Sequence, residues 1–140
     1  MMNRIFYFIL IIFVCLSFFV GCSLSNLENT DTNTIEITYE QITQDEAKSI
    51  MDSEESYILL DVRTQEEYDA EHIEGAILIP DYEIEIKAES ILTDKNALIL
   101  VYCRSGRRSK NAASQLVTLG YTNIKEFGGI IDWEYDTITK

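Results

Sequence analysis

The chain has 140 residues, which is enough for one domain. Its net charge of −13, from 24 acidic and 11 basic residues, argues against a general nucleic-acid binder, because such proteins need a basic face to neutralise phosphates. One proline, six glycines and three cysteines exclude collagen-like, low-complexity and disulfide-scaffold proteins. The single histidine excludes a histidine-rich metal site.

The start of the chain predicts a targeting signal. A short positive segment, residues 1–4, precedes an almost entirely apolar stretch at 5–20, which is shorter than the about 20 residues of a membrane-spanning helix but suits a signal peptide. Small residues then lead to Cys22, and this arrangement resembles the lipobox of bacterial lipoprotein precursors. The resemblance implies that residues 1–21 are a lipoprotein signal peptide and that Cys22 carries the lipid. An uncleaved membrane anchor is the alternative, and both interpretations place the domain outside the cytoplasm on a membrane surface.

Residues 22–34 predict a flexible tether behind the lipidated cysteine, because they consist mainly of Ser, Asn, Thr, Asp and Glu. Cleavage would remove Cys15, and lipid would block Cys22. The mature chain then holds one free thiol, Cys103, which is unusual outside the cytoplasm. The remaining residues, 35–140, form the predicted domain.

The first half of that domain predicts two strand–helix units. Residues 35–39 alternate apolar and polar, as in a short strand. Capping boxes, each a threonine with a glutamate three residues later, open helices at Thr43 and at Thr64, the first ending near Met51. Between them, residues 57–62 are nearly all apolar and predict a strand buried on both faces.

The second half continues the alternation of strands and helices. Its expected elements are a buried strand at 76–79, a helix at 83–92, the most hydrophobic strand at 97–102, a helix at 107–119 with Ala112, Ala113, Leu116 and Val117 facing inward, a strand at 124–127, and a short helix carrying Trp133. Such alternation predicts an α/β domain with a central, mostly parallel sheet and helices on both faces.

Charge is distributed unevenly along the domain. Residues 95–125 carry six Lys and Arg residues and no acidic residue, whereas residues 22–94 carry 20 acidic and three basic residues. A solvated basic patch is one interpretation. The position of several of these cations around Cys103 favours a functional one.

The segment with the clearest chemistry is CRSGRRS, residues 103–109, between the most hydrophobic strand and the next helix. In open parallel sheets, ligands bind outside the carboxyl ends of the strands. A loop that curls there into a helix points several backbone N–H groups at one spot, and Gly106 permits the tight curl. Cys103 would lie at the centre, where arginines and the helix N-terminus favour the nucleophilic thiolate. No general base is evident nearby, and the alternative is a buried structural cysteine.

These residues resemble a single-domain rhodanese, a thiosulfate sulfurtransferase-like protein. The resemblance rests on CRSGRRS, on LLDVRTQEEYDAEHIEGAILIP at 59–80, and on Gly128-Gly129 with Trp133. It implies the rhodanese-like α/β fold and a two-step reaction. Cys103 takes the outer sulfur of an anionic donor such as thiosulfate as a persulfide, and cyanide or a thiol removes it. The resemblance implies no metal or organic cofactor. The negative net charge predicts no nucleic-acid partner, and we expect a monomer.

The expected site residues fall into two groups. The substrate anion would be bound by Arg104, Ser105, Gly106, Arg107 and Arg108. Asp61 and Arg63 would support the site, with Asp61 pairing with a loop arginine. Arg108 is expected to hydrogen-bond loop carbonyls or the bound anion, or else to be a free surface arginine. His72 is expected to hydrogen-bond at a turn, with a general-base role as the alternative.

Two other functions are compatible with the same residues. One is an extracytoplasmic persulfide carrier or a non-catalytic partner-binding module. The other is a cysteine phosphatase or arsenate reductase of the same fold, whose loop resembles this one but has five residues between cysteine and arginine. Here four residues separate Cys103 from Arg108, and the longer loop would place its arginine at Ser109. The smaller ring should suit a single sulfur better than a tetrahedral oxyanion.

Overall fold

The computed structural model describes residues 38–53 and 56–140. The predicted signal peptide, Cys22 and the tether lie outside these described residues. Within the described part, no helix is both long enough and apolar enough to cross a membrane.

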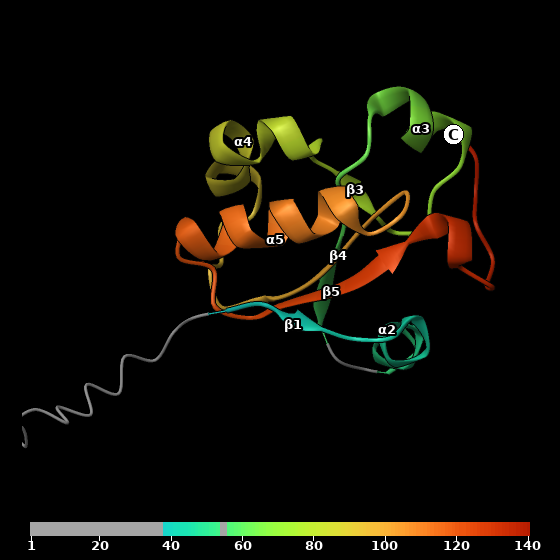
Figure 1. Cartoon of the computed structure of the whole chain (residues 1–140), viewed down its shortest axis with the longest axis horizontal. Helices are drawn as coiled ribbons and strands as arrows, with labels where there is room; N and C mark the ends of the chain where they lie inside the picture. Colours follow the sequence, from blue (N-terminus) through green and yellow to red (C-terminus); the bar gives the residue numbers. More distant parts are fainter. Residues whose placement is uncertain (1–37, 54–55) are drawn as a thin grey trace, which may run out of the picture. The chain divides into compact units, whose positions relative to one another are not determined.

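The centre of the domain is a sheet of five parallel strands in the order β1-β5-β4-β2-β3 (Figure 1). The strands are β1 (Glu40–Gln41), β2 (Tyr57–Asp61), β3 (Ile77–Leu78), β4 (Leu98–Cys103) and β5 (Ile124–Gly129). This confirms the predicted α/β class. Because β4 lies in the middle, the loop that follows it emerges at the centre of the carboxyl edge of the sheet, where open α/β sheets bind ligands.

Helices cover both faces of the sheet. The helices are α2 (Gln44–Met51), α3 (Gln65–Ala70), α4 (Ile84–Ile91) and α5 (Arg107–Thr118), with two 3-10 turns, η1 (Asp81–Glu83) and η2 (Ile130–Asp132). Figure 1 shows α4 and α5 above one face, α2 below the other, and α3 beside the carboxyl end of the sheet. Both predicted capping boxes are present, at Thr43 and at Thr64.

Two apolar clusters form the core, one on each face. Leu60, Ile99 and Val101 pack with α4 and α5, whereas Leu100 and Phe127 pack with α2. Successive residues of β4 therefore alternate between the clusters. This two-sided burial explains why its sequence is a continuous apolar run.

Two sequence predictions differ from the structure. Residues 38 and 39 are not in a strand: pairing with β5 begins at Glu40, and residues 35–37 lie outside the described part. The strand predicted as buried at 76–79 is shorter, and Ile77 is 37% exposed. The reason is that β3 is the edge strand, so part of its surface has no neighbour.

Candidate active site

The loop between β4 and α5 wraps around Cys103. Cys103 is the last residue of β4 and is almost fully buried, at 1% exposure. Gly106 begins α5 as its N-cap with φ of +90°, a left-handed conformation that glycine adopts without steric penalty. This turn directs the Gly106 N–H at the cysteine, where it donates to Sγ at 3.1 Å. Gly106 therefore supplies one N–H group of the predicted ring of donors.

The environment of Cys103 favours its ionised form. Burial, the largest effect, raises the pKa of the thiol, but the Ser109 hydroxyl and the backbone N–H groups of Ser109, Ser105 and Gly106 together outweigh it. The net result is a pKa below the ordinary value of 9. Since the thiolate is the nucleophilic form, the loop supplies activation by oriented dipoles at the start of a helix.

Strand β5 packs closely against the loop. Its pairing with β4 is irregular, because Val101 lies opposite Glu126 but Cys103 lies opposite Gly129. This brings Gly129 so close to the loop that a Cβ there would lie 2.2 Å from the Arg104 carbonyl oxygen. Only glycine fits at position 129 without displacing the loop. The sequence analysis had used the Gly128-Gly129 pair only as a family signature.

Arg108 has a different partner from the one expected. It forms a two-pronged ion pair with Glu67 of α3, in which Nη1 donates to Oε2 and Nη2 to Oε1, both at 2.7 Å. Within the described part of the chain, the Arg108 side chain forms no hydrogen bond to a carbonyl of the loop. The guanidinium is thus held in one orientation by a helix from elsewhere in the chain and still interacts electrostatically with Cys103.

The expected pairing of Asp61 with a loop arginine is wrong. Asp61 is fully buried and accepts from Arg63, two residues away, with Nε at 3.0 Å and Nη2 at 2.6 Å. Arg63 also lies over the ring of Tyr102, 5.7 Å from its centroid. The pair is satisfied internally, because an aspartate at the end of β2 meets the turn that follows it before any residue of the β4–α5 loop.

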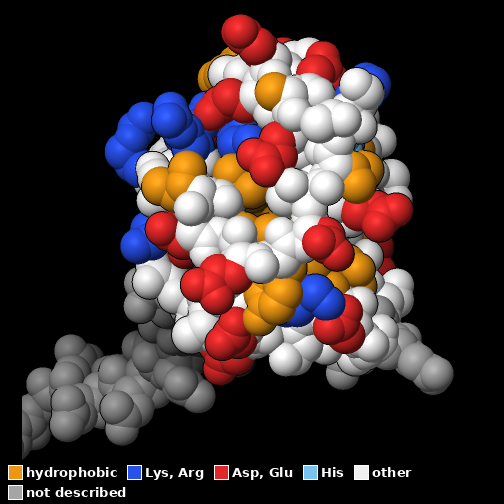
Figure 2. Space-filling model, turned by 90° about the vertical axis from the view of Figure 1, so that its right-hand side faces the viewer, with side chains coloured by type: hydrophobic (Ala, Val, Ile, Leu, Met, Phe, Trp, Pro, Cys, Tyr) orange, Lys and Arg blue, Asp and Glu red, His pale blue; other side chains and the backbone are white. Residues whose placement is uncertain are grey.

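The other two arginines expected at the site, and Lys110 of the following helix, have exposed side chains. Arg104, Arg107 and Lys110 are exposed, as is Ser105. Figure 2 shows a group of Lys and Arg side chains at the upper left of this face, with others at its right, left and lower parts and Asp and Glu side chains between them. The exposed cations of the loop are therefore placed where they would meet a small anion that approaches it.

His72 lies away from the cysteine loop. It is 5% exposed, its Nδ1 is 2.8 Å from the Tyr68 carbonyl oxygen, and its ring stacks on that of Tyr68 at 3.8 Å. Its backbone exchanges hydrogen bonds with Ile138 near the C-terminus. These contacts agree with the structural role and give no support to the general-base alternative.

Sequence analysis missed two carboxylates of the site. Glu67 was recognised only as the third residue of a capping box, which it also is, since it accepts from the Thr64 N–H at 3.0 Å. Glu126 of β5 was not singled out, yet it is 2% exposed and accepts from Ser109 Oγ at 2.6 Å. The available signal for Glu126 was its position between Lys125 and Phe127 in a predicted strand, where alternation does not decide which charged residue is buried.

The Glu67–Arg108 pair predicts a pH-dependent contribution to stability. The Arg108 guanidinium, assisted by the Thr64 N–H and opposed by burial, lowers the pKa of Glu67 from 4.5 to about 2. Because the folded pKa is depressed, the stabilisation is complete above the unfolded value and is lost as the pH falls toward 2. Glu67→Gln keeps the capping box but removes the charge, and should lower the free energy of unfolding by about 2 kcal/mol at pH 7.

Urea unfolding at pH 7 and at pH 2.5 measures this effect. We expect the difference between the native protein and Glu67→Gln to shrink at the lower pH, where the native carboxyl is becoming protonated. Glu66→Gln on the exposed side of α3 is the matched control and should change stability little at either pH. An equal loss at both pH values would mean that the ion pair is not the source of the stabilisation.

The fold and this loop describe an α/β protein that presents a cysteine within a ring of backbone donors. The rhodanese-like domain model matches residues 43–136, and the chain belongs to that family. It is 41% identical over 73 residues to the thiosulfate sulfurtransferase PspE of Escherichia coli, covering 52% of this chain and 70% of that protein. It is 36% identical over 80 residues to a sulfurtransferase of Allochromatium vinosum, covering 56% of this chain and 73% of that protein.

A solved structure supports the same assignment. The rhodanese with anions from E. coli superposes with a TM-score of 0.57 at 35% identity, covering 61% of this chain and all of that one. The chain is therefore a member of the rhodanese-like sulfurtransferase family, as its motifs predicted.

Proposed function

We propose that the protein transfers sulfane sulfur from an anionic donor such as thiosulfate to cyanide or a thiol through a persulfide on Cys103. The observation that carries the proposal is the buried Cys103 sulfur, which accepts from the Gly106 N–H at 3.1 Å and has a lowered pKa. A relative named thiosulfate sulfurtransferase supports the same choice of donor.

The proposed reaction has two displacement steps. The Cys103 thiolate attacks the outer sulfur of thiosulfate, a new S–S bond forms, and sulfite leaves with the electron pair of the broken S–S bond. The acceptor nucleophile then attacks the outer sulfur, and Cys103 leaves as the thiolate. Neither step needs an external oxidant or reductant, because in each step the leaving group takes the electron pair of the S–S bond that breaks.

The loop chemistry suits both steps. The donor and the terminal sulfur of the persulfide are anionic, so oriented N–H groups and nearby guanidinium groups stabilise them. Arg108, fixed by Glu67, supplies a positive charge that interacts with Cys103. Arg104 and Arg107 are exposed where an approaching anion would meet them first.

Assays with two substrates on the unaltered protein test the assignment. We expect thiosulfate and cyanide to give thiocyanate, and an aryl phosphate to remain intact. Phosphoryl transfer requires donors around all equatorial oxygens. Ser109 stands where the longer phosphatase loop would place its arginine, and it is fully buried against β5. Phosphate release without thiocyanate formation would overturn the assignment.

The persulfide-carrier alternative shares the chemistry of the first step. A carrier would gain one sulfur atom on Cys103 from thiosulfate but would not turn over with cyanide or small thiols. Intact-protein mass spectrometry after thiosulfate treatment, read beside the turnover assay, separates the two functions.

For localisation, we propose that Cys22 is lipidated after removal of residues 1–21 and holds the domain at the outer side of a cell membrane. The motive is the apolar segment followed by Gly21 and Cys22. Mass spectrometry of the membrane-extracted protein should find an acylated cysteine as the first residue. An unmodified Cys22 in a chain that still begins with Met1 would contradict the proposal.

A further inference from the structure

The Ser109 hydroxyl lies among several groups that can accept a hydrogen bond from it. Its Oγ is 2.6 Å from Glu126 Oε1, 3.0 Å from the Gly106 carbonyl oxygen and 3.3 Å from the Gly128 carbonyl oxygen. Ser109 is fully buried, so water does not compete at this position. A hydroxyl carries one proton and can donate fully to only one acceptor at a time.

Glu126 is the strongest of these acceptors. A carboxylate forms shorter and stronger hydrogen bonds than a carbonyl oxygen, and the bond from Ser109 is the shortest of the three. The same Oε1 accepts from the Gly128 N–H at 2.9 Å. In the part of the chain that the structure describes, no Lys or Arg forms an ion pair with Glu126. The charge of this buried carboxylate therefore depends on the donors that Ser109 and Gly128 provide.

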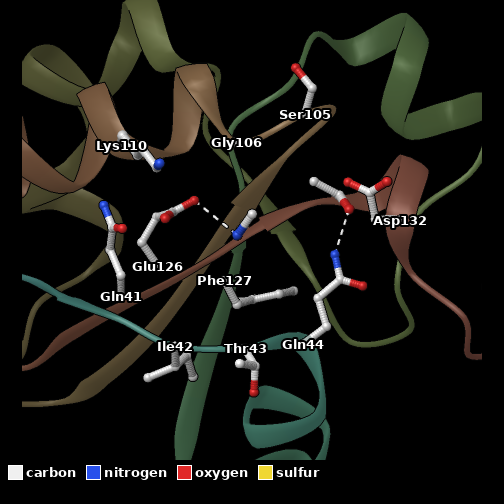
Figure 3. Close-up of a pocket in the computed structure, with 12 residues that line it drawn as sticks. Gln41, Ile42, Thr43, Gln44, Ser105, Gly106, Lys110, Glu126, Phe127 and Asp132 are labelled. Atoms are coloured by element: carbon white, nitrogen blue, oxygen red, sulfur yellow. Dashed lines mark hydrogen bonds between the residues drawn. The ribbon is translucent and has the colours of Figure 1, made fainter.

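A cavity of about 410 Å³ lies between the cysteine loop and the start of α2, and Gly106, Glu126 and Gln44 are among the residues that line it (Figure 3). Gln41, Lys110 and Asp132 are among the polar residues that line it with Glu126. Glu126 therefore contacts both this cavity and Ser109, and Ser105 and Gly106 of the cysteine loop line the same cavity. The arrangement links the charge of Glu126 to the loop through one hydroxyl.

We propose that the Ser109 hydroxyl is a shared hydrogen-bond donor. In the resting protein it donates to Glu126, and it rotates to donate to the sulfur of Cys103 when that sulfur carries a full negative charge. The turn is a rotation of the O–H bond, so no proton is lost or gained and no co-reactant is needed. Glu126 is then a positioning residue that acts through Ser109. The inference goes beyond the proposed function, because it requires only an ionisable Cys103 and not a particular sulfur donor.

This sharing of the hydroxyl affects the pKa and the nucleophilicity of the Cys103 thiol. The Ser109 hydroxyl is among the groups that lower the pKa of Cys103. While the hydroxyl donates to Glu126, the Cys103 thiolate lacks this hydrogen bond. The thiolate is then less stabilised and more nucleophilic. When Cys103 leaves the persulfide as a thiolate, the hydroxyl becomes available to stabilise it.

Other charged groups face the same region and stay constant in the test. Arg108 interacts electrostatically with Cys103, and Glu67 and Asp81 act on Arg108. Arg104 and Arg107 are exposed residues of the same loop. Around Glu126 they are Lys110 and Asp132 at the cavity. A change that depends on Ser109 can therefore be separated from the general field by comparing variants that differ only at positions 109 and 126.

The test is the rate of Cys103 alkylation by iodoacetamide as a function of pH, measured by peptide mass spectrometry on the full chain in detergent. We expect Glu126→Gln to move the midpoint down by roughly one pH unit, because a neutral amide competes less for the hydroxyl proton. Ser109→Ala should move the midpoint up, and Ser109→Thr, which keeps the hydroxyl, should restore it. In the Ser109→Ala background, Glu126→Gln should have a much smaller effect.

Two control variants leave Ser109 and Glu126 unchanged. Glu134→Gln makes the same change in net charge at an exposed site, and Ser114→Ala removes a hydroxyl that bonds only within α5; neither should move the midpoint. Equal shifts by Glu126→Gln with and without Ser109 would show a through-space charge effect and overturn the proposal. An unchanged midpoint in a folded Ser109→Ala protein would overturn it independently, even if Glu126→Gln proved too unstable to assay.

Discussion

Replacing Cys103 by serine should abolish sulfur transfer and leave the domain folded. Serine is close in size to cysteine, so the buried position between β4 and α5 stays filled. A hydroxyl at this position has no adjacent base and would be far less ionised than the thiol, so the nucleophile is lost. Thiocyanate formation from thiosulfate and cyanide should fall on the order of 10³-fold or more.

Mass spectrometry gives a second readout for the same variant. The native protein should gain about 32 Da on treatment with thiosulfate, one sulfur atom in a persulfide, and Cys103→Ser should not. Circular dichroism and thermal unfolding establish that the variant is folded. Turnover that persisted in a folded Cys103→Ser protein would mean that another group carries the sulfur.

Gly129→Ala should also have a large effect, for a steric reason. The new Cβ would lie 2.2 Å from the Arg104 carbonyl oxygen and 2.4 Å from the Ser105 Cα, and both neighbours are backbone atoms that cannot rotate away. The loop must therefore move off β5, which disturbs the donors around Cys103. We expect a loss of about 3 kcal/mol in the free energy of unfolding, together with most of the activity.

Gly75→Ala is the control for Gly129→Ala. Gly75 has φ of +82° and nothing within 4 Å of an added Cβ, so alanine there costs only backbone strain of about 1 kcal/mol. Urea unfolding and the thiosulfate assay on both variants separate the two effects. If Gly129→Ala retained full activity, the close approach of β5 would not be what shapes the loop.

The elements of the fold could be predicted from the sequence because their signals are local. A threonine and a glutamate three residues apart are sufficient to start a helix, and both capping boxes formed at Thr43 and Thr64 as expected. The apolar run of β4 identified a strand covered on both faces. The burial of β3 could not be predicted in this way, because it depends on whether another strand lies beside it.

The contacts around Cys103 required the tertiary structure. Sequence analysis placed Cys103 and Gly106 in one loop, because a strand, a short glycine-containing turn and a helix constrain a few neighbouring residues. It did not find the partner of Arg108, since Glu67 is 41 residues away and belongs to another helix. The nearness of Gly129 to Arg104 likewise follows from how β5 pairs with β4.

By itself, the sequence determined that this protein is an α/β domain with a cysteine in an arginine-rich loop of rhodanese type, because hydrophobic periodicity, capping and loop motifs act over a few residues. The tertiary structure decided which carboxylates meet that loop: Glu67 holds Arg108, and Glu126 holds Ser109. The physical reason is that ion pairs and buried hydrogen bonds form between whichever groups the packed strands and helices bring within about 3 Å. The chain has many Asp and Glu residues with the same chemistry, and only their positions in the fold determine which of them contact the loop.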